Sequence, residues 1–216
     1  MAKNDGEEKK VDIAAFYEMA QIRAGCVEPA QLVGLWTEAN TTLVEQRVRN
    51  AVVQCGIVGT VIPDFAQTAD GFDRSNQSKG NVAADAFALS LACDPTQLAV
   101  HRLRGAGYPD RRLVIPDQDF SCCLEFKATS DWNDGDSNRR VLTSSPAKLL
   151  AAIVSNELPE SPCHLIGTVI YDRQIGTVIG FRLDFIGPDS LVNVRLEAST
   201  SHKLLSQGQH RSIIIN

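Results

Sequence analysis

Three short apolar segments near the middle of the chain, each followed by turn-forming residues, constrain the fold more than any other feature. The sequence reads QLAVHRL (97–103), GAGYPD, RRLVI (111–115), PDQD and then FSCCLEFKA (120–128). Clusters of glycine, proline and aspartate between β-favouring runs are typical of strands joined by turns. These segments therefore predict three consecutive strands.

Helical patterns lie on both sides of the predicted strands. NVAADAFALSLAC (81–93) precedes them, after a polar loop at 63–80, and AKLLAAIVSNEL (147–158) follows them, with Ser145 as cap and Pro146 in the first turn. Further strands are expected at 164–171, 174–185 and 190–198. From residue 80 to 170 the order is helix, strand, strand, strand, helix, strand, which predicts an α/β protein.

The N-terminal third has mostly helical periodicity. Apolar residues recur at helical spacing over 11–24, a second helix is expected after Pro29, and a third is expected from Thr41 or Thr42 to about 54, because Thr42 and Glu45 resemble a capping box. We therefore expect an N-terminal helical region at 1–78, packed into the same compact unit as residues 79–216.

Composition places the chain among ordinary globular proteins: 216 residues, 44% of them hydrophobic. The apolar runs fall short of the roughly 20 residues that a membrane span requires, and no signal peptide is evident, so a cytoplasmic protein without a membrane partner is expected. The six cysteines lack zinc-site spacing, which favours reduced, mostly buried thiols. The net charge of −5 argues weakly against nucleic-acid binding, unless basic residues cluster locally.

The turn at 116–119 predicts the strand register of the central hairpin. If Pro116 lies opposite Asp119, then Asp110 lies directly across from Glu125. A register shifted by two would leave the two carboxylates diagonal on the same face, whereas a three-residue loop would put them on opposite faces. Cys122, Leu124, Phe126 and Ala128 would form an apolar face, with Glu125 and Lys127 on the other. Asp117, at the turn, would be about 20 Å or more from Glu125 along the strand.

Two carboxylates that converge on one face suit a hard cation such as Mg²⁺. A lysine on the same face would orient a water molecule or stabilise developing charge on a phosphodiester. The alternative interpretation is a surface ion pair on an exposed strand.

The stretch Pro109-Asp110, followed by Glu125-Phe126-Lys127, resembles the motif of the PD-(D/E)XK nuclease superfamily, and more narrowly that of type II restriction endonucleases. The element order of 80–170 is similar to that family's αβββαβ core, a central mixed sheet flanked by helices. The resemblance covers about 90 residues and leaves both ends of the chain unexplained.

The resemblance implies roles for particular residues. Asp110 and Glu125 would bind Mg²⁺, the carbonyl of Phe126 would add a ligand, and Lys127 would assist the attacking water. Asp85 is the candidate for an additional acid from the first core helix. Contacts with DNA are expected from the polar loop after the catalytic strand and from the next helix: Asn133, Asn138, Arg139, Arg140 and Lys148.

The resemblance also implies partners. A type II enzyme would act on double-stranded DNA as a homodimer, because two symmetry-related sites suit a palindrome, and would belong to a prokaryotic system with a cognate methyltransferase. The N-terminal helical region at 1–78 would then provide dimerisation or clamp DNA. Two alternatives stay open. One is a structure-specific repair or recombination nuclease, and the other is a non-catalytic DNA-binding protein with the same fold.

Overall fold

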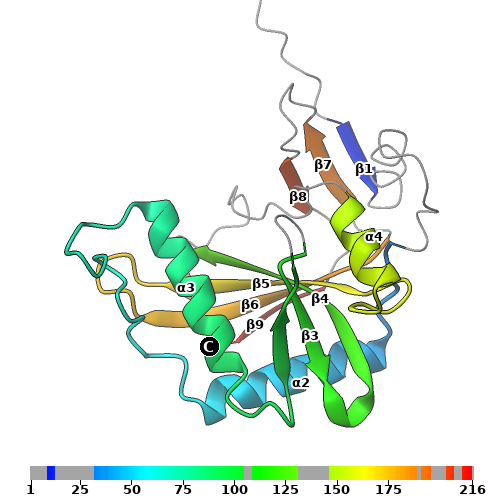
Figure 1. Ribbon diagram of the computed structural model, residues 1–216, viewed down its shortest axis with the longest axis horizontal. Coiled ribbons are helices and arrows are strands. Elements are labelled where there is room, and N and C mark those ends of the chain that lie inside the picture. The colour runs from blue at the N-terminus through cyan, green and yellow to red at the C-terminus, as the bar shows by residue number, and fades with distance from the viewer. Residues whose placement is uncertain are drawn as a thin grey trace, which may run out of the picture.

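The computed structural model describes residues 9–12, 32–104, 109–130, 146–188, 191–195, 203–206 and 211–215. Its main feature is a six-stranded mixed sheet with the strand order β2-β3-β4-β5-β6-β9 (Figure 1). The strands are β2 (Ala99–Arg102), β3 (Arg111–Ile115), β4 (Phe120–Thr129), β5 (His164–Tyr171), β6 (Val178–Ile186) and β9 (Arg211–Ile215).

Neighbouring strands are antiparallel except for β4 and β5, which are parallel. A parallel pair needs a crossover connection, and helix α4 (Pro146–Val154) lies in that connection. With helix α3 (Asn76–Leu91) before β2, the order α3-β2-β3-β4-α4-β5 is the one predicted from the sequence. The α/β class, with a mixed sheet flanked by helices, is thereby confirmed.

Helices α2 (Glu38–Gln54) and α3 pack on one face of this sheet and form the main core. The apolar face predicted for β4 is buried there: Leu124 and Phe126 belong to the core, and the ring of Phe126 lies 6.1 Å from that of Phe87 of α3. Phe87 also stacks on Phe181 of β6, with 4.1 Å between ring centroids. Burial of this face fixes which side chains of β4 point the other way.

Helix α4 lies on the face of the sheet opposite to the one that α2 and α3 cover. Its Leu149 and Ala152 are buried but lie outside the core cluster under α2 and α3, and Lys148 of α4 interacts electrostatically with Glu125. This second face is polar at its centre, because Glu125 and the ion pair of Arg182 with Asp184 are all buried on it.

Two helices begin earlier than the sequence patterns predicted. α2 begins at Glu38 rather than at Thr41 or Thr42, because Thr37 is its cap and accepts a hydrogen bond from the Asn40 backbone N–H at 3.1 Å. α3 begins at Asn76, inside the predicted loop, because Ser75 caps it in the same way. In both cases a single hydroxyl satisfies an exposed amide of the first turn.

The N-terminal prediction is wrong in two places. Residues Lys9–Asp12 form strand β1, which pairs with β7 (Leu191–Arg195), and this overlaps the start of the helix predicted for 11–24. Residues 32–37 contain no helix, where one was expected after Pro29. Residues 13–31 lie outside the described ranges. A third strand, β8 (Lys203–Ser206), completes a small sheet of order β1-β7-β8.

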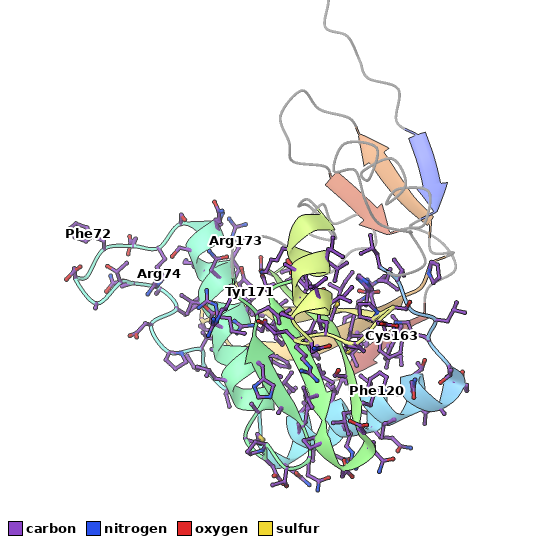
Figure 2. The ribbon with its side chains drawn as sticks, turned by 45° about the vertical axis from the view of Figure 1, so that its right-hand side comes forward. Phe72, Arg74, Phe120, Cys163, Tyr171 and Arg173 are labelled. Atoms are coloured by element: carbon purple, nitrogen blue, oxygen red, sulfur yellow. A yellow bond between two sulfur atoms is a disulfide. The ribbon has the colours of Figure 1, made fainter. Side chains whose placement is uncertain are left out.

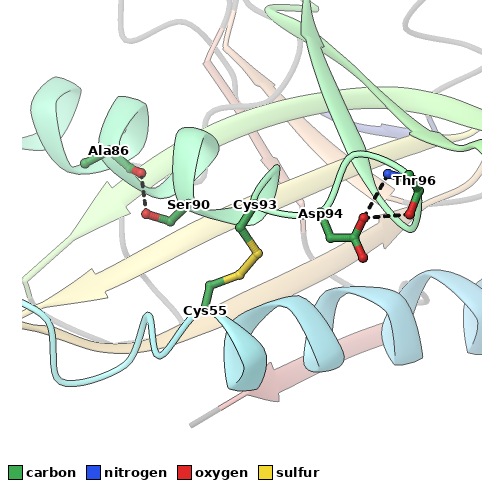
Figure 3. Close-up of a disulfide and its surroundings, with 6 residues drawn as sticks. All are labelled: Cys55, Ala86, Ser90, Cys93, Asp94 and Thr96. Atoms are coloured by element: carbon green, nitrogen blue, oxygen red, sulfur yellow. Dashed lines mark hydrogen bonds between the residues drawn. A yellow bond between two sulfur atoms is a disulfide. The ribbon is translucent and has the colours of Figure 1, made fainter.

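Cys55 and Cys93 form a disulfide that joins the end of α2 to the residues just after α3 (Figure 3). The prediction of reduced cysteines is wrong for this pair, because the two thiols are 38 residues apart and become neighbours only when the helices pack. Cys122, Cys123 and Cys163 are free and buried, as expected. Within the described ranges, no helix combines the length and apolar character needed to cross a membrane.

Candidate active site

The hairpin of β3 and β4 has the register predicted from its turn. Arg111 pairs with Leu124 and Arg112 with Cys123, so the same register places Asp110 opposite Glu125. The turn consists of the short 3-10 helix Pro116–Gln118 and Asp119 in a left-handed conformation, φ 46°. Asp110 is exposed, and its carbonyl accepts a hydrogen bond from the Leu103 backbone N–H at 3.0 Å. The backbone bond to Leu103 and the register of β3 with β4 therefore position Asp110.

Glu125 and Lys127 contact each other on the polar face of β4. The Lys127 Nζ lies 2.5 Å from Oε1 of Glu125, whose residue is only 6% exposed. The second carboxylate oxygen, Oε2, is buried and has no hydrogen-bond partner in the part of the chain that the structure describes. A buried carboxylate oxygen without a donor is costly, and it is also the group that a cation would satisfy.

The electrostatics of Glu125 favour an added positive charge. Burial is the largest influence and raises the pKa of the Glu125 carboxyl above its ordinary value. The ammonium of Lys127 opposes that rise, the carboxylate of Asp110 adds to it, and hydrogen bonds from Lys127 and the Asp110 backbone lower the pKa again. Since the carboxylate of Asp110 raises the pKa of Glu125, the two acidic groups lie close together.

Lys148 on α4 belongs to the same group of charges. Burial lowers the pKa of its ammonium, while Asp110 and Glu125 raise it and Arg102 lowers it further. The sequence predicted a DNA contact for Lys148, and the structure places it beside the two carboxylates. Two ammonium groups, from β4 and α4, thus approach the same acidic pair.

The residues present fit a Mg²⁺ ion with a small protein ligand set. Mg²⁺ is commonly held by one or two carboxylates, with water and substrate phosphate completing its shell. Asp110 and Glu125 would supply the carboxylates, and the unpartnered Oε2 of Glu125 is consistent with such a ligand. Over the described ranges, no group of three or more His, Cys, Asp or Glu residues is arranged to hold a metal ion.

Two other acids form ion pairs of their own. Asp85 of α3 pairs with Arg111, which is opposite Leu124 and thus on the core side of the hairpin. A role for Asp85 at a metal stays a prediction, as does the Phe126 carbonyl. Asp117 pairs with Arg47 of α2 at the turn of the hairpin, the location predicted for it.

The predicted base-reading residues Asn133, Asn138, Arg139 and Arg140 lie outside the described residues. Sequence reasoning also missed a buried ion pair on β6. Arg182 and Asp184 are 3% and 2% exposed, with 2.7 Å between Nε and Oδ1. Register places Arg182 opposite Thr168, which is itself opposite Lys127. The alternation of charged residues within the strand sequence FRLDF was the available signal.

Comparison of the chain with protein-family models, with curated protein sequences and with solved structures found no match.

Proposed function

We propose that this protein is a Mg²⁺-dependent nuclease of the PD-(D/E)XK superfamily that hydrolyses phosphodiester bonds in double-stranded DNA. One arrangement carries the proposal: the register of the hairpin puts Asp110 opposite Glu125, Lys127 contacts Glu125, and among the described residues Oε2 of Glu125 has no hydrogen-bond partner. The αβββαβ element order around the hairpin is that of a restriction-endonuclease-like core, which gives further support.

The chain's own residues have separable tasks in this proposal. Asp110 and Glu125 provide the negative charge that would hold the ion, with the Phe126 carbonyl as a further ligand. When bound, Mg²⁺ supplies Lewis acidity toward a phosphodiester and its attacking water. Lys127, positioned by Glu125, orients the water molecule, and Lys148 adds positive charge beside the scissile phosphate.

Within the superfamily, we place the protein among type II restriction endonucleases. A homodimer would bring two such sites to a palindrome, and the enzyme would work in the cytoplasm of a prokaryote together with a cognate methyltransferase. The polar residues Asn133, Asn138, Arg139 and Arg140 are the candidates for reading the sequence.

A non-catalytic DNA-binding protein is the second candidate. The ion pair between Lys127 and Glu125 favours it, because that pair on its own would hold a strand face together without any metal. In that case the neutral substitution Glu125→Gln would lower the stability of the fold.

Cleavage of plasmid DNA distinguishes the candidates. We expect discrete fragments with Mg²⁺, binding without cutting with Ca²⁺, and loss of cutting in Asp110→Asn. The matched control is Asp117→Asn, which removes the same charge at the far end of the same strand. Nicking that depends on DNA structure would favour a repair nuclease. Binding without cutting in Mg²⁺ would favour the non-catalytic protein. Equal cutting by Asp110→Asn and the wild type would refute the assignment of the site.

A further inference from the structure

A basic pocket lies at the edge of the central sheet, beside the carboxylate pair. It has a volume of about 360 Å³. Its lining consists of His101, Arg102, Leu103, Arg104, Arg112 and Glu157. Leu103 donates its backbone N–H to the carbonyl of Asp110, so the pocket begins one strand away from the proposed metal ligand. Three arginines and one acid give it a positive charge, in a protein whose net charge is −5.

Among the residues that the structure describes, the arginines of this pocket have no acidic partners. Elsewhere in the described part of the chain, Arg47, Arg49, Arg111 and Arg182 each contact a carboxylate. Over the same ranges, no ion pair involves Arg102, Arg104 or Arg112. The buried Nε of Arg112 has no hydrogen-bond partner among the described residues. An unsatisfied guanidinium nitrogen beside two unpaired arginines is the arrangement expected where an anion is to be bound.

Charged groups of the pocket interact with those of the candidate active site through Lys148. Arg102 lowers the pKa of the Lys148 ammonium, and Lys148 also interacts with Asp110 and Glu125. Adjacent strands are about 4.8 Å apart. A phosphate in the pocket would therefore lie close to one at the carboxylates.

The geometry points to a phosphate-binding subsite formed by Arg102, Arg104 and Arg112, which holds a phosphate of the nucleic-acid strand close to the scissile one. Guanidinium groups match phosphate oxygens in a bidentate manner, so this pocket takes an oxyanion rather than an apolar ligand. The inference rests on the proposed nuclease function for the identity of its ligand. The phosphate has two possible sources, an internal phosphodiester or the terminal phosphate of a cleaved strand.

The first test is independent of cleavage. Binding of inorganic phosphate and pyrophosphate is measured by thermal shift without metal, for the wild type, Arg102→Ala/Arg104→Ala and Arg173→Ala. Arg173 is an exposed arginine in the turn between β5 and β6, without an ion pair in the described ranges, and Figure 2 shows it near α3. We expect the double substitution to abolish the shift and Arg173→Ala to preserve it. A shift that survives the double substitution, or that Arg173→Ala removes equally, overturns the subsite.

The second test uses short duplexes with either a 5′-phosphate or a 5′-hydroxyl, measured by fluorescence anisotropy in EDTA over a range of salt concentrations. We expect Arg102→Ala/Arg104→Ala to weaken binding by about tenfold or more and to reduce the salt slope by about 1 to 2. If only the 5′-phosphorylated duplex loses affinity, the subsite binds a terminal phosphate; if both lose it, the subsite binds an internal one.

Substitution of Glu157 should change the affinity for phosphate in the opposite direction, toward tighter binding. Glu157 is the acid in the lining, so Glu157→Gln should tighten phosphate binding several-fold. Glu160 is an exposed acid three residues away, and Glu160→Gln should leave phosphate binding unchanged.

A failure of DNA cleavage with intact phosphate binding would refute the proposed function and not the subsite. Normal cleavage with unchanged affinity and salt slope in the double variant would refute the subsite alone.

Discussion

Lys127 and Glu125, two residues apart on β4, bring an ammonium and a carboxylate to within 2.5 Å on the polar face of the sheet. Alternation along a strand places positions i and i+2 on the same side, so this contact is local in origin. Asp110 joins the pair only through the register of the hairpin. Substitutions of Asp110, Glu125 and Lys127 are therefore expected to change DNA cleavage and the stability of the fold in different ways.

The substitution Glu125→Gln should abolish cleavage without destabilising the fold. Burial raises the pKa of Glu125, so at neutral pH the folded protein bears the cost of ionising it. A neutral amide removes that cost, and we expect a Tm at or above that of the wild type, with cleavage reduced by about 10²-fold or more.

The pH dependence of stability tests whether ionised Glu125 destabilises the folded protein. The wild type should gain stability relative to Glu125→Gln as the pH falls and Glu125 takes up its proton, so the two curves converge in acid. Glu160→Gln is the control for the loss of an exposed acid. A marked drop in Tm for Glu125→Gln at neutral pH would instead support a structural ion pair.

Mg²⁺ should stabilise the folded protein, because an ion that binds only the folded state adds about 2.7 kcal/mol at 100 times its Kd. That corresponds to a rise in Tm of about 5 °C or more for a chain of this size. We expect differential scanning fluorimetry to show this shift in Asp117→Asn and to show none in Asp110→Asn. The same shift in both variants would place the ion elsewhere.

His164 should make the fold sensitive to acid. Its ring is fully buried, with Nε2 2.6 Å from the Leu32 carbonyl, and burial lowers its pKa to about 4. Between the unfolded pKa of about 6.5 and the folded one, the unfolded chain takes up a proton that the folded chain excludes. Stability is therefore complete above about 6.5 and is lost as the pH falls, by up to about 3 kcal/mol.

The substitution His164→Gln keeps a donor for the Leu32 carbonyl and removes the titration. Urea unfolding at several pH values should give a flatter profile for this variant between about pH 4 and 6.5. Parallel profiles for the two proteins would contradict the assignment of the acid sensitivity to His164.

Two glycines should respond in opposite directions to alanine. A Cβ at Gly167, which pairs with Phe126, would come within 2.5 Å of the Phe181 ring, so Gly167→Ala should cost about 1 to 3 kcal/mol. A Cβ at Gly80 in α3 would make an ordinary 3.9 Å contact with Ala128, so Gly80→Ala should stabilise the helix by about 0.5 to 1 kcal/mol. Chemical denaturation measures both, and equal effects would refute the packing argument.

Much of the fold could be predicted where the pattern of neighbouring residues in the sequence specifies it. Strands β3 and β5 begin and end where turn residues and β-favouring runs predicted, and the apolar face of β4 is buried as expected. The helix starts were misplaced because two hydroxyls, on Thr37 and Ser75, are equally good caps and lie outside the apolar pattern.

The sequence by itself predicted the register of the hairpin between β3 and β4, because a short turn and strict alternation leave a hairpin few registers, and this register puts Asp110 opposite Glu125. Only the tertiary structure decided that Lys148 and Arg102 join this pair, that Cys55 meets Cys93, and that Arg182 and Asp184 are buried together. Except for the pair within β6, these contacts connect segments far apart in the chain. They form because the crossover through α4 and the packing of α2 on α3 bring those segments together, which no local pattern of residues specifies.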